Sequence, residues 1–300
     1  MIQALGIFLL AAAVGSAVEP TAQQAKVFAD IKKLGGSCGV EEKAGKRFIG
    51  VIQVDAPITD AELKLFSQLT NVEEATFITA GVKDQTLEHL PKWTGLRVLA
   101  LGNNDITDAG IKHLTAFPRL QVLWLEQNPL ITGKGMKYLE GLKHLRELNL
   151  QSTRADDSGL QYVERLSDLQ ELDLTGTQVT DAGMKHLAGL VKLQRLDVSG
   201  PKISDAGLKY LEKLINLEIL DLVDTNITDA GLEHVRGLTQ LRILDLHGTR
   251  VTDAGLQRLT GLRNLQSLGL LRTKVTKDGV ERLKKALPNC QIDYQKQVVR

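Results

Sequence analysis

Hydrophobic side chains recur along most of this chain with a period of 24 residues. In the most regular copy, which runs from Leu169 to Lys192, leucines stand at offsets 0, 3, 5, 18 and 21 from the first residue. The alternating pair Leu172 and Leu174 predicts a short strand with one buried face. Three apolar residues spaced by three within residues 184–190 predict a short helix. One strand and one helix cannot enclose a core alone, so the copies must stack on one another.

Ten such copies, or units, follow each other without a linker, and we name each unit by its first residue. The units begin at Phe48, Val72, Leu96, Leu120, Leu145, Leu169, Leu193, Leu217, Leu241 and Leu265. Every interval is 24 residues except the 25-residue interval that starts at Leu120. We place the extra residue near Asn128–Leu130 and expect a local bulge there. The near-constant length predicts one continuous solenoid over residues 48–289.

Three recurring polar or small positions have a structural explanation. A Thr or Asn at offset 8 is expected to hydrogen-bond the backbone from coil to coil. Thr-Asp at offsets 11 and 12 is expected to satisfy free amides at each helix start. Glycine at offset 14 is expected to let neighbouring coils pack closely.

The first residues predict a signal peptide over residues 1–17. An apolar run from Ala4 to Val14 is followed by Gly15 and Ala17, which suit a cleavage site after Ala17. The run is too short to span a bilayer, so the mature chain should have no stable membrane span. We therefore expect export to a periplasm, a cell envelope or the extracellular space.

Both ends of the solenoid need a cap, because a terminal coil would expose its core. An N-terminal cap is expected over residues 18–47, with a helix at Thr21–Leu34 and a loop-like segment at Ser37–Lys46. Residues 290–300 should form a last edge strand and a polar tail. Cys38 and Cys290 stand at opposite ends, roughly 40 Å apart for ten strands at about 4.8 Å spacing. They should therefore not pair within one chain, and each is expected to be a buried thiol.

The unit pattern LxxLxLxxTxVTDAGLxxLxxL resembles that of leucine-rich repeat proteins. The VTDAGL and ITDAGL segments are similar to those of the ribonuclease-inhibitor-like and cysteine-containing subclasses. The TDAGL units and the ALPNC ending resemble secreted leucine-rich repeat proteins of planctomycete-type bacteria. The resemblance implies an α/β fold: a right-handed solenoid, or horseshoe, with a parallel β-sheet on the concave face and short helices on the convex face.

The same resemblance implies an alternative function. Eukaryotic cysteine-containing relatives are often F-box substrate receptors of ubiquitin ligases, which act as adaptors in a cytosol. This chain has Thr or Asn where those relatives carry the repeat cysteine.

Composition and motifs exclude several classes of function. A net charge of +1 and 4% aromatic residues argue against a nucleic-acid partner, which needs a basic surface or a row of stacking rings. No nucleophile elbow, phosphate loop, HExxH motif or paired Cys/His spacing is present, so we predict no enzyme, no catalytic residue, no cofactor and no metal ligand. Four histidines share offset 17 on a helix flank, where we expect half-buried packing. They are His89, His113, His186 and His234.

Four consecutive units carry a carboxylate at offset 4, namely Asp173, Asp197, Asp221 and Asp245. Carboxylates on neighbouring parallel strands would form a ladder about 4.8 Å apart. One reading is a cation-binding or glycan-binding surface. The simpler reading is a structural ladder that Arg195 and Arg242 neutralise.

The remaining variable positions, at offsets 2, 4, 6 and 7, should face the concave surface and bind a protein or peptide. They form two regions. The first surrounds Trp124, the only tryptophan at such an offset, which we expect to be an exposed interface anchor; the second surrounds the isoleucines at offset 2. The first region contains Val98, Val122, Trp124, Glu126, Asn149 and Gln151. The second contains Ile219, Asp221, Val223, Asp224, Ile243, Asp245, His247, Leu271 and Arg272. Polar residues lie between the two regions, namely Glu147, Glu171 and Arg195. The favoured function is an exported, non-enzymatic protein-binding scaffold; the oligomeric state is not predicted.

Overall fold

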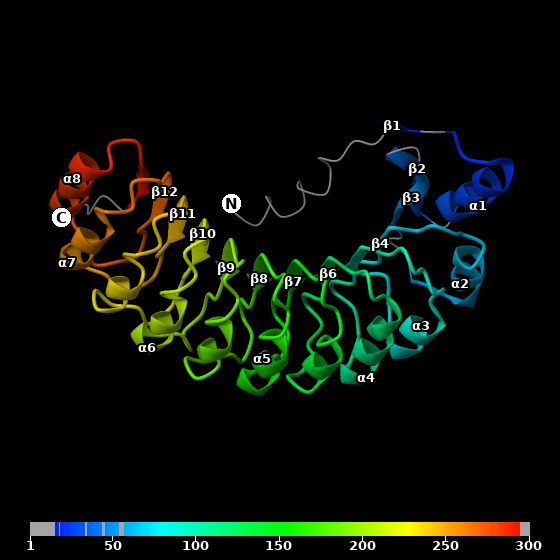
Figure 1. The fold of residues 1–300 in the computed structure, drawn as a ribbon, viewed down its shortest axis with the longest axis horizontal. Coiled ribbons are helices and arrows are strands. Elements are labelled where there is room, and N and C mark those ends of the chain that lie inside the picture. The colour runs from blue at the N-terminus through cyan, green and yellow to red at the C-terminus, as the bar shows by residue number, and fades with distance from the viewer. Residues whose placement is uncertain (1–15, 18, 34, 44–45, 54–56, 295–300) are drawn as a thin grey trace.

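The computed structural model describes residues 16–17, 19–33, 35–43, 46–53 and 57–294. They form a curved solenoid in which one sheet lines the inner, concave side and the helices cover the outer side (Figure 1). The predicted right-handed α/β solenoid is confirmed. Among the described residues, no helix is long and apolar enough to cross a bilayer.

The sheet contains the described strands in sequence order. They are β1 (Ser16–Ala17), β2 (Ser37–Lys43), β3 (Lys46–Gln53), β4 (Glu74–Thr76), β5 (Val98–Ala100), β6 (Val122–Trp124), β7 (Glu147–Asn149), β8 (Glu171–Asp173), β9 (Arg195–Asp197), β10 (Ile219–Asp221), β11 (Ile243–Asp245), β12 (Ser267–Gly269) and β13 (Gln291–Asp293). From β3 onward all neighbours are parallel, and from β4 to β12 each strand is the same three residues of its unit. Equivalent positions of successive units therefore lie side by side across the concave face.

Short helices return the chain along the convex side. The α-helices are α1 (Ala22–Lys33), α2 (Asp60–Phe66), α3 (Asp84–His89), α4 (Asp108–Ile111), α5 (Asp157–Val163), α6 (Asp205–Leu208), α7 (Asp253–Leu256) and α8 (Lys277–Ala286). The 3-10 helices are η2 (Lys112–Ala116), η3 (Gly135–Tyr138), η4 (Met184–Leu187), η5 (Lys209–Leu211), η6 (Gly231–His234) and η7 (Gln257–Leu259). Between the two layers lies the leucine core, in which most side chains have no exposed surface.

The Asp at offset 12 joins two units, a contact that the sequence pattern did not predict. The Thr hydroxyl caps its own helix as expected, since Thr228 Oγ1 accepts from the Ala230 amide at 3.2 Å. The Asp at offset 12 reaches forward to the Thr of the next unit. Asp205, which follows Ser204, accepts from the Thr228 amide at Oδ1 (2.8 Å) and from the Thr228 hydroxyl at Oδ2 (2.6 Å). We call this paired contact the inter-unit Asp bridge.

The same bridge recurs along the solenoid. It joins Asp84 to Thr107, Asp108 to Thr132, Asp157 to Thr180, Asp181 to Ser204, Asp205 to Thr228, Asp229 to Thr252 and Asp253 to Thr276. The glycine at offset 14 makes room for it: a Cβ added to Gly231 would come within 2.3 Å of Asp205 Oδ1. The predicted role of that glycine in close packing thus has a specific neighbour, the carboxylate of the preceding unit.

At offset 8, Asn and Thr bind differently. Asn104 crosses to the preceding unit, donating to the Phe77 carbonyl at 2.7 Å and accepting from the Val82 amide at 2.9 Å. Thr225 stays within its own unit and donates to the Leu222 carbonyl at 2.7 Å. The expectation of a coil-to-coil ladder is therefore right for Asn and wrong for Thr, whose hydroxyl is too short to span two strands.

The N-terminal cap differs from the prediction in one element. The expected helix is α1, but the expected loop at Ser37–Lys46 is instead strand β2, which pairs antiparallel with β3. The hairpin closes the edge of the sheet that would otherwise present unpaired backbone groups. The proposed signal peptide lies outside the described residues except for Ser16–Ala17, which pair with β2.

Other features of the ends and of the long unit are as follows. Leu130 beside the expected insertion is 48% exposed, while β6 and β7 keep their register on either side. Helix α8 ends at Ala286, and β13 adds the expected last strand; the tail from residue 295 lies outside the described residues.

Cys290 is buried and Cys38 is half-buried; each is a free thiol at its own end of the sheet. Burial raises the pKa of Cys38 to about 12 and raises that of Cys290 as well.

Candidate binding surface on the concave strands

A single groove of about 880 Å³ runs along the concave face from Trp124 on β6 to Asp293 on β13. Because the strands are in register, the groove is lined by the same positions of successive units, mainly offsets 2, 4 and 6. The two regions that the sequence suggested are therefore the two ends of one surface. We call it the concave groove.

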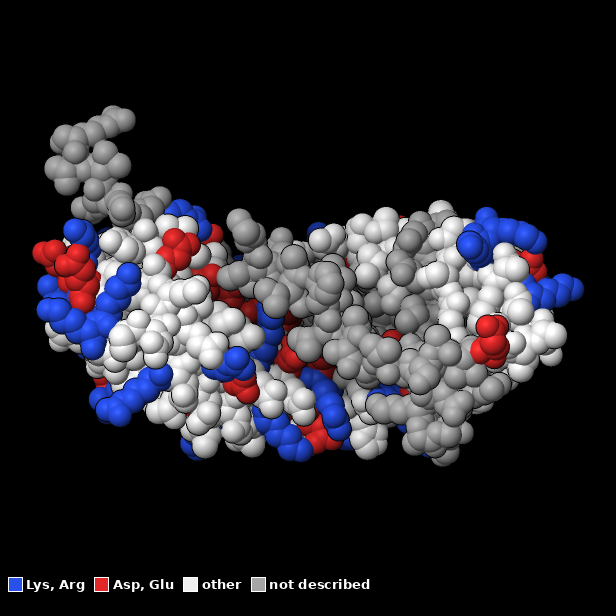
Figure 2. Space-filling view, turned by 90° about the horizontal axis from the view of Figure 1, so that it is seen from above, with Lys and Arg blue, Asp and Glu red and all other residues white. Residues whose placement is uncertain are grey.

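Acidic side chains dominate the concave groove. Its lining contains eight carboxylates and one guanidinium, that of Arg195, although the whole chain has a net charge of +1. Seen from this side, acidic residues gather in the hollow while many basic residues project around the outside (Figure 2). The groove thus presents a local negative charge that total composition conceals.

The carboxylates at offset 4 are mostly held by their own backbone. Asp173, Asp221 and Asp245 each use Oδ1 to accept from the amide two residues further on, at 2.8–3.0 Å. Asn149 does the same toward the Gln151 amide at 2.9 Å. The turn after the strand therefore fixes each side chain in the row, which supports the structural reading of these positions.

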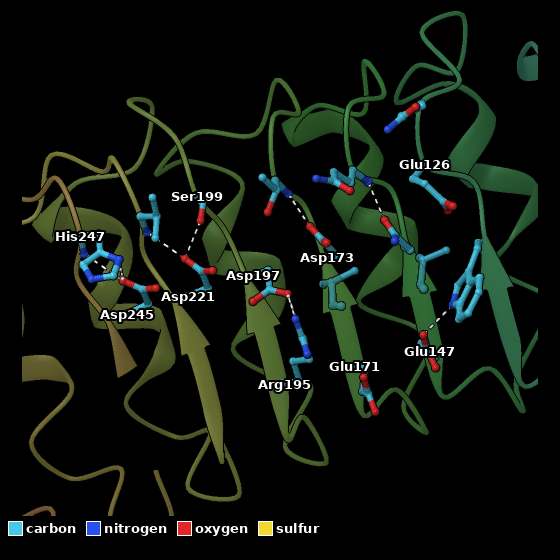
Figure 3. A pocket seen from close by; sticks show the side chains of 18 of the residues that line it. Glu126, Glu147, Glu171, Asp173, Arg195, Asp197, Ser199, Asp221, Asp245 and His247 are labelled. Atoms are coloured by element: carbon cyan, nitrogen blue, oxygen red, sulfur yellow. Dashed lines mark hydrogen bonds and ion pairs between the residues drawn. The ribbon is translucent and has the colours of Figure 1, made fainter. Parts of the chain in front are cut away.

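Asp197 is the exception in this row. Its Oδ2 accepts two hydrogen bonds from Arg195, from Nε at 3.0 Å and from Nη2 at 2.9 Å. Its Oδ1 is buried and has no hydrogen-bond partner within the described part of the chain. The side chain is only 6% exposed and lies between Asp173 and Asp221, which Figure 3 shows on the flanking strands. Burial raises the pKa of Asp197 to about 7, and Asp173 and Asp221 add to the rise while Arg195 opposes it.

The expected neutralisation of this row is half right. Arg195 does pair with Asp197, but Arg242 does not reach the row. Arg242 stands at offset 1 and contacts Glu218 Oε2 at 3.2 Å, on the flank of the sheet. Among the described residues, Arg195 is therefore the one Lys or Arg side chain that lines the groove.

At the N-terminal end of the groove, Trp124 contacts the next unit. Its Nε1 donates to Glu147 Oε1 at 2.5 Å (Figure 3), so the ring is half-buried rather than exposed as expected. Burial raises the pKa of Glu147 to about 7, and neighbouring Glu171 acts in the same direction. Glu126 lies over Gly102 of the preceding unit, and burial raises its pKa too.

At the other end, His247 packs against two carboxylates. Its Nδ1 lies 3.0 Å from Asp245 Oδ1, and its Nε2 lies 3.7 Å from Asp293 Oδ2. Gly269 at offset 4 of the next unit leaves room for the ring, because a Cβ there would come within 2.8 Å of His247 Nε2. Burial, with Asp221 and Asp293, raises the pKa of Asp245 against the opposing effect of His247.

The structure places most of the predicted site residues in the groove. Trp124, Glu126, Asn149, Asp221, Val223, Asp245, His247 and Leu271 line it. Val122, Ile219 and Ile243 stand at offset 2 on the same strands but outside the lining.

Three predicted residues have other roles. Val98 is 8% exposed, because it is packed between β4 and β6, and is a core residue. Asp224 and Arg272 stand at offset 7, where the backbone turns with positive φ of 56° and 59°, and their side chains pair at 3.0 Å.

The centre of the groove is not among the residues predicted from the sequence to bind. It contains Glu147, Glu171, Asp173, Arg195 and Asp197. The four consecutive aspartates at offset 4 were the feature of the sequence that could have indicated an acidic centre of the groove.

A metal site in a protein gathers several histidine, cysteine or carboxylate side chains around one point. Among the described residues, no three His, Cys, Asp or Glu side chains are grouped as a metal site would need. On the helix flank, His186 Nδ1 lies 2.6 Å from Glu164, and His234 Nδ1 lies 2.6 Å from Glu212 of the preceding unit. These contacts fit the packing role predicted for offset 17.

Comparison with known proteins gives a consistent assignment. A family model described as leucine-rich repeat region matches residues 103–295. Leucine-rich repeat-containing protein 42 of Xenopus tropicalis is 34% identical over 106 residues, which are 32% of this chain and 25% of that protein. The chain thus spans a quarter of the length of this curated relative.

Among solved structures, an internalin (inlF) of Listeria monocytogenes has a TM-score of 0.56 at 19% identity, over 96% of this chain and 93% of that one. An internalin C2 of the same species has a TM-score of 0.50 at 20% identity, over 94% and 100%. The mouse RP105/MD-1 complex gives a TM-score of 0.61 at 21% identity, over 77% and 39%. At these identities the likeness shows the fold alone.

Proposed function

This chain belongs to the leucine-rich repeat family, and we propose that it is an exported, non-enzymatic scaffold that binds a protein segment in its concave groove. The family and its solenoid fold support a role in protein–protein interaction. The observation that carries the proposal is the groove itself, in which side chains vary from unit to unit while the Asp bridges and leucine core repeat.

The dimensions of the groove suit an extended peptide. From β6 to β13 there are seven strand spacings of about 4.8 Å, or roughly 34 Å. An extended chain advances about 3.3 Å per residue, so about ten residues would fill this length. A half-buried tryptophan at one end and a histidine at the other provide anchors of the kind that dominate binding energy at interfaces.

Selection from a random 12-residue peptide library, with the immobilised protein as bait, tests this proposal. Peptides that bind the wild type should bind the double variant Trp124→Ala/His247→Ala at least about tenfold more weakly. The matched control is Val191→Ala/Ile215→Ala, which removes two exposed apolar side chains, 49% and 58% exposed, outside the groove. Its affinity should equal that of the wild type.

Two results would contradict the proposal. One is a selection that enriches no peptide. The other is a set of peptides whose binding depends on Val191 and Ile215 but not on the groove residues, because such binding would reflect general surface stickiness.

Export, a bacterial source and the ribonuclease-inhibitor-like subclass remain proposals that rest on the sequence pattern. N-terminal sequencing of the protein isolated from its source should start at Val18. A chain that retains its first residues and lies in the cytosol would favour the adaptor alternative instead.

A further inference from the structure

The strongest unassigned feature of the molecule is the isolated oxygen of Asp197 at the centre of the concave groove. Asp173, Asp221 and Asp245, the other offset-4 aspartates described above, accept from the amide two residues on. The corresponding residue of the Leu193 unit, Ser199, donates its hydroxyl to Asp221 Oδ1 at 2.7 Å instead. Asp197 is thus the one member of this set of four whose orientation its own turn does not fix.

The turn after β9 explains the difference. Pro201 stands at offset 8, where the Thr amide of other units donates to the offset-5 carbonyl, and proline has no N–H to donate. The preceding Gly200 has φ of 127°, against 54–71° at offset 7 of the Leu96 to Leu265 units otherwise. The altered turn coincides with the rotation of Asp197 toward Arg195, which occupies one carboxylate oxygen and leaves the other without a partner.

An unpartnered carboxylate oxygen on a buried side chain is costly, so a native protein usually gives it a partner. Here the surroundings define the kind of partner. Asp173 and Asp221 flank Asp197 on the neighbouring strands, about 4.8 Å away on each side. Among the described residues, Arg195 is the only guanidinium or ammonium group that lines the groove, and it is already bound to Oδ2. Three carboxylates thus share one cation, and a further positive charge would offset the negative charge that is left.

The shape of the site favours an ammonium over a guanidinium group. An ammonium carries three N–H donors that point in different directions, so it can serve carboxylates from three strands at once. A guanidinium binds best as a planar fork on both oxygens of one carboxylate, and Asp197 offers only one free oxygen. Val223, which also lines the groove, provides an apolar contact for an aliphatic stem.

We propose that the centre of the concave groove is a lysine receptor, in which the ammonium group of a partner's lysine side chain binds Asp197 Oδ1 between Asp173 and Asp221. This inference rests on the proposed function, since it names the chemistry of the partner that the groove would recognise. The pKa of Asp197, raised to about 7 by burial, should fall when a cation arrives, and binding should therefore release a proton at neutral pH.

The peptides selected as above are the probe, and their lysines are the variable. Selected peptides that depend on the groove should be enriched in lysine. Replacing the essential lysine by Nε-acetyl-lysine should weaken binding at least about tenfold, and replacing it by arginine should also weaken it.

Two protein variants with opposite expected effects separate this role from damage to the fold. Asp197→Asn should weaken binding at least about tenfold. Arg195→Gln should strengthen it, because it frees Oδ2 and removes a competing cation. The controls carry the same charge changes at exposed pairs outside the groove, namely Asp168→Asn beside Lys192 and Arg165→Gln beside Glu140, and should leave binding unchanged. Melting curves of all variants establish that each is folded.

The outcomes distinguish this inference from the proposed function. If peptides depend on Trp124 and His247 but tolerate acetyl-lysine, or bind Asp197→Asn as tightly as wild type, the lysine receptor is wrong and the scaffold proposal stands. Equal loss with Asp197→Asn and Asp168→Asn would show that only net charge matters and would also overturn the receptor. If no peptide depends on the groove, both proposals fail.

Discussion

The inter-unit Asp bridge offers the sharpest test of how the solenoid is held together. In the wild type, the Thr228 amide and hydroxyl donate to the Asp205 carboxylate at 2.8 and 2.6 Å. Asp205→Ala removes the acceptor of both hydrogen bonds. A hydrogen bond to a charged group contributes about 1.5–3 kcal/mol, and these two are partly buried, so we expect a loss of about 2–4 kcal/mol. Asp205→Asn keeps one acceptor and should lose about half of that.

Urea unfolding followed by circular dichroism measures this loss. For a slope of about 3 kcal/mol/M, the midpoint should fall by roughly 1 M. In a solenoid, each unit contacts only its neighbours, so a weakened interface can also separate the array into two unfolding steps. A biphasic curve in Asp205→Ala would therefore agree with the bridge as a coupling element.

The matched control is Asp168→Ala, which removes an equally charged side chain that pairs with Lys192 Nζ at 2.6 Å on the exposed surface. Such pairs contribute little because water screens them, so its midpoint should change little. If Asp205→Ala is no more destabilising than Asp168→Ala, the bridge does not couple the units, and the recurrence of Asp at offset 12 needs another cause.

Two further predictions concern the groove and the glycine. Asp197 and Glu147, each with a pKa raised to about 7 mainly by burial, keep protons in the folded state that the unfolded chain releases near its ordinary pKa of about 4. The folded state then binds more protons, so the free energy of unfolding should decrease between pH of about 4 and 7, by up to about 4 kcal/mol for each group. Asp197→Asn/Glu147→Gln should flatten this decline, and an unchanged slope in urea unfolding at several pH values would contradict it. Gly231→Ala, which brings Cβ within 2.3 Å of Asp205, should cost about 1–3 kcal/mol in the same assay, whereas Gly237→Ala, with open space around it, should change stability by about 0.5 kcal/mol or less, and equal effects would refute the close-packing argument.

The sequence predicted the solenoid well because the period itself determines the register. Leucines at offsets 3 and 5 must face one way in every unit, so successive strands have a single way to align. The N-terminal hairpin was predicted less well. Residues of β2 belong to no repeat, and its pairing with β3 follows from the need to close a sheet edge.

The contacts of the polar positions could not be predicted from one unit. The Thr-Asp motif lies at a helix start, which predicts that its Asp binds there, but Asp229 binds Thr252, 23 residues away. Asp197 looks like Asp173 in the sequence, and only the changed turn at Pro201 sets the two apart. Such differences depend on side-chain orientation, which a hydrophobic pattern does not encode.

The groove begins where the scaffold loses one of its own connections. In the 25-residue unit, Gly133 stands where other units have the bridging aspartate, so this position has no carboxylate that could reach the next unit. In that next unit, Asp156 caps the start of its own helix, α5. On the concave side of the same interface, Trp124 Nε1 donates to Glu147 at 2.5 Å and connects the two units there. This interface therefore lacks the two hydrogen bonds of the Asp bridge on the convex side and has one hydrogen bond on the concave side, which is part of the groove. A ligand that contacts Trp124 or Glu147 would therefore act on the interface between the Leu120 and Leu145 units. Binding there should change how strongly these two units are coupled.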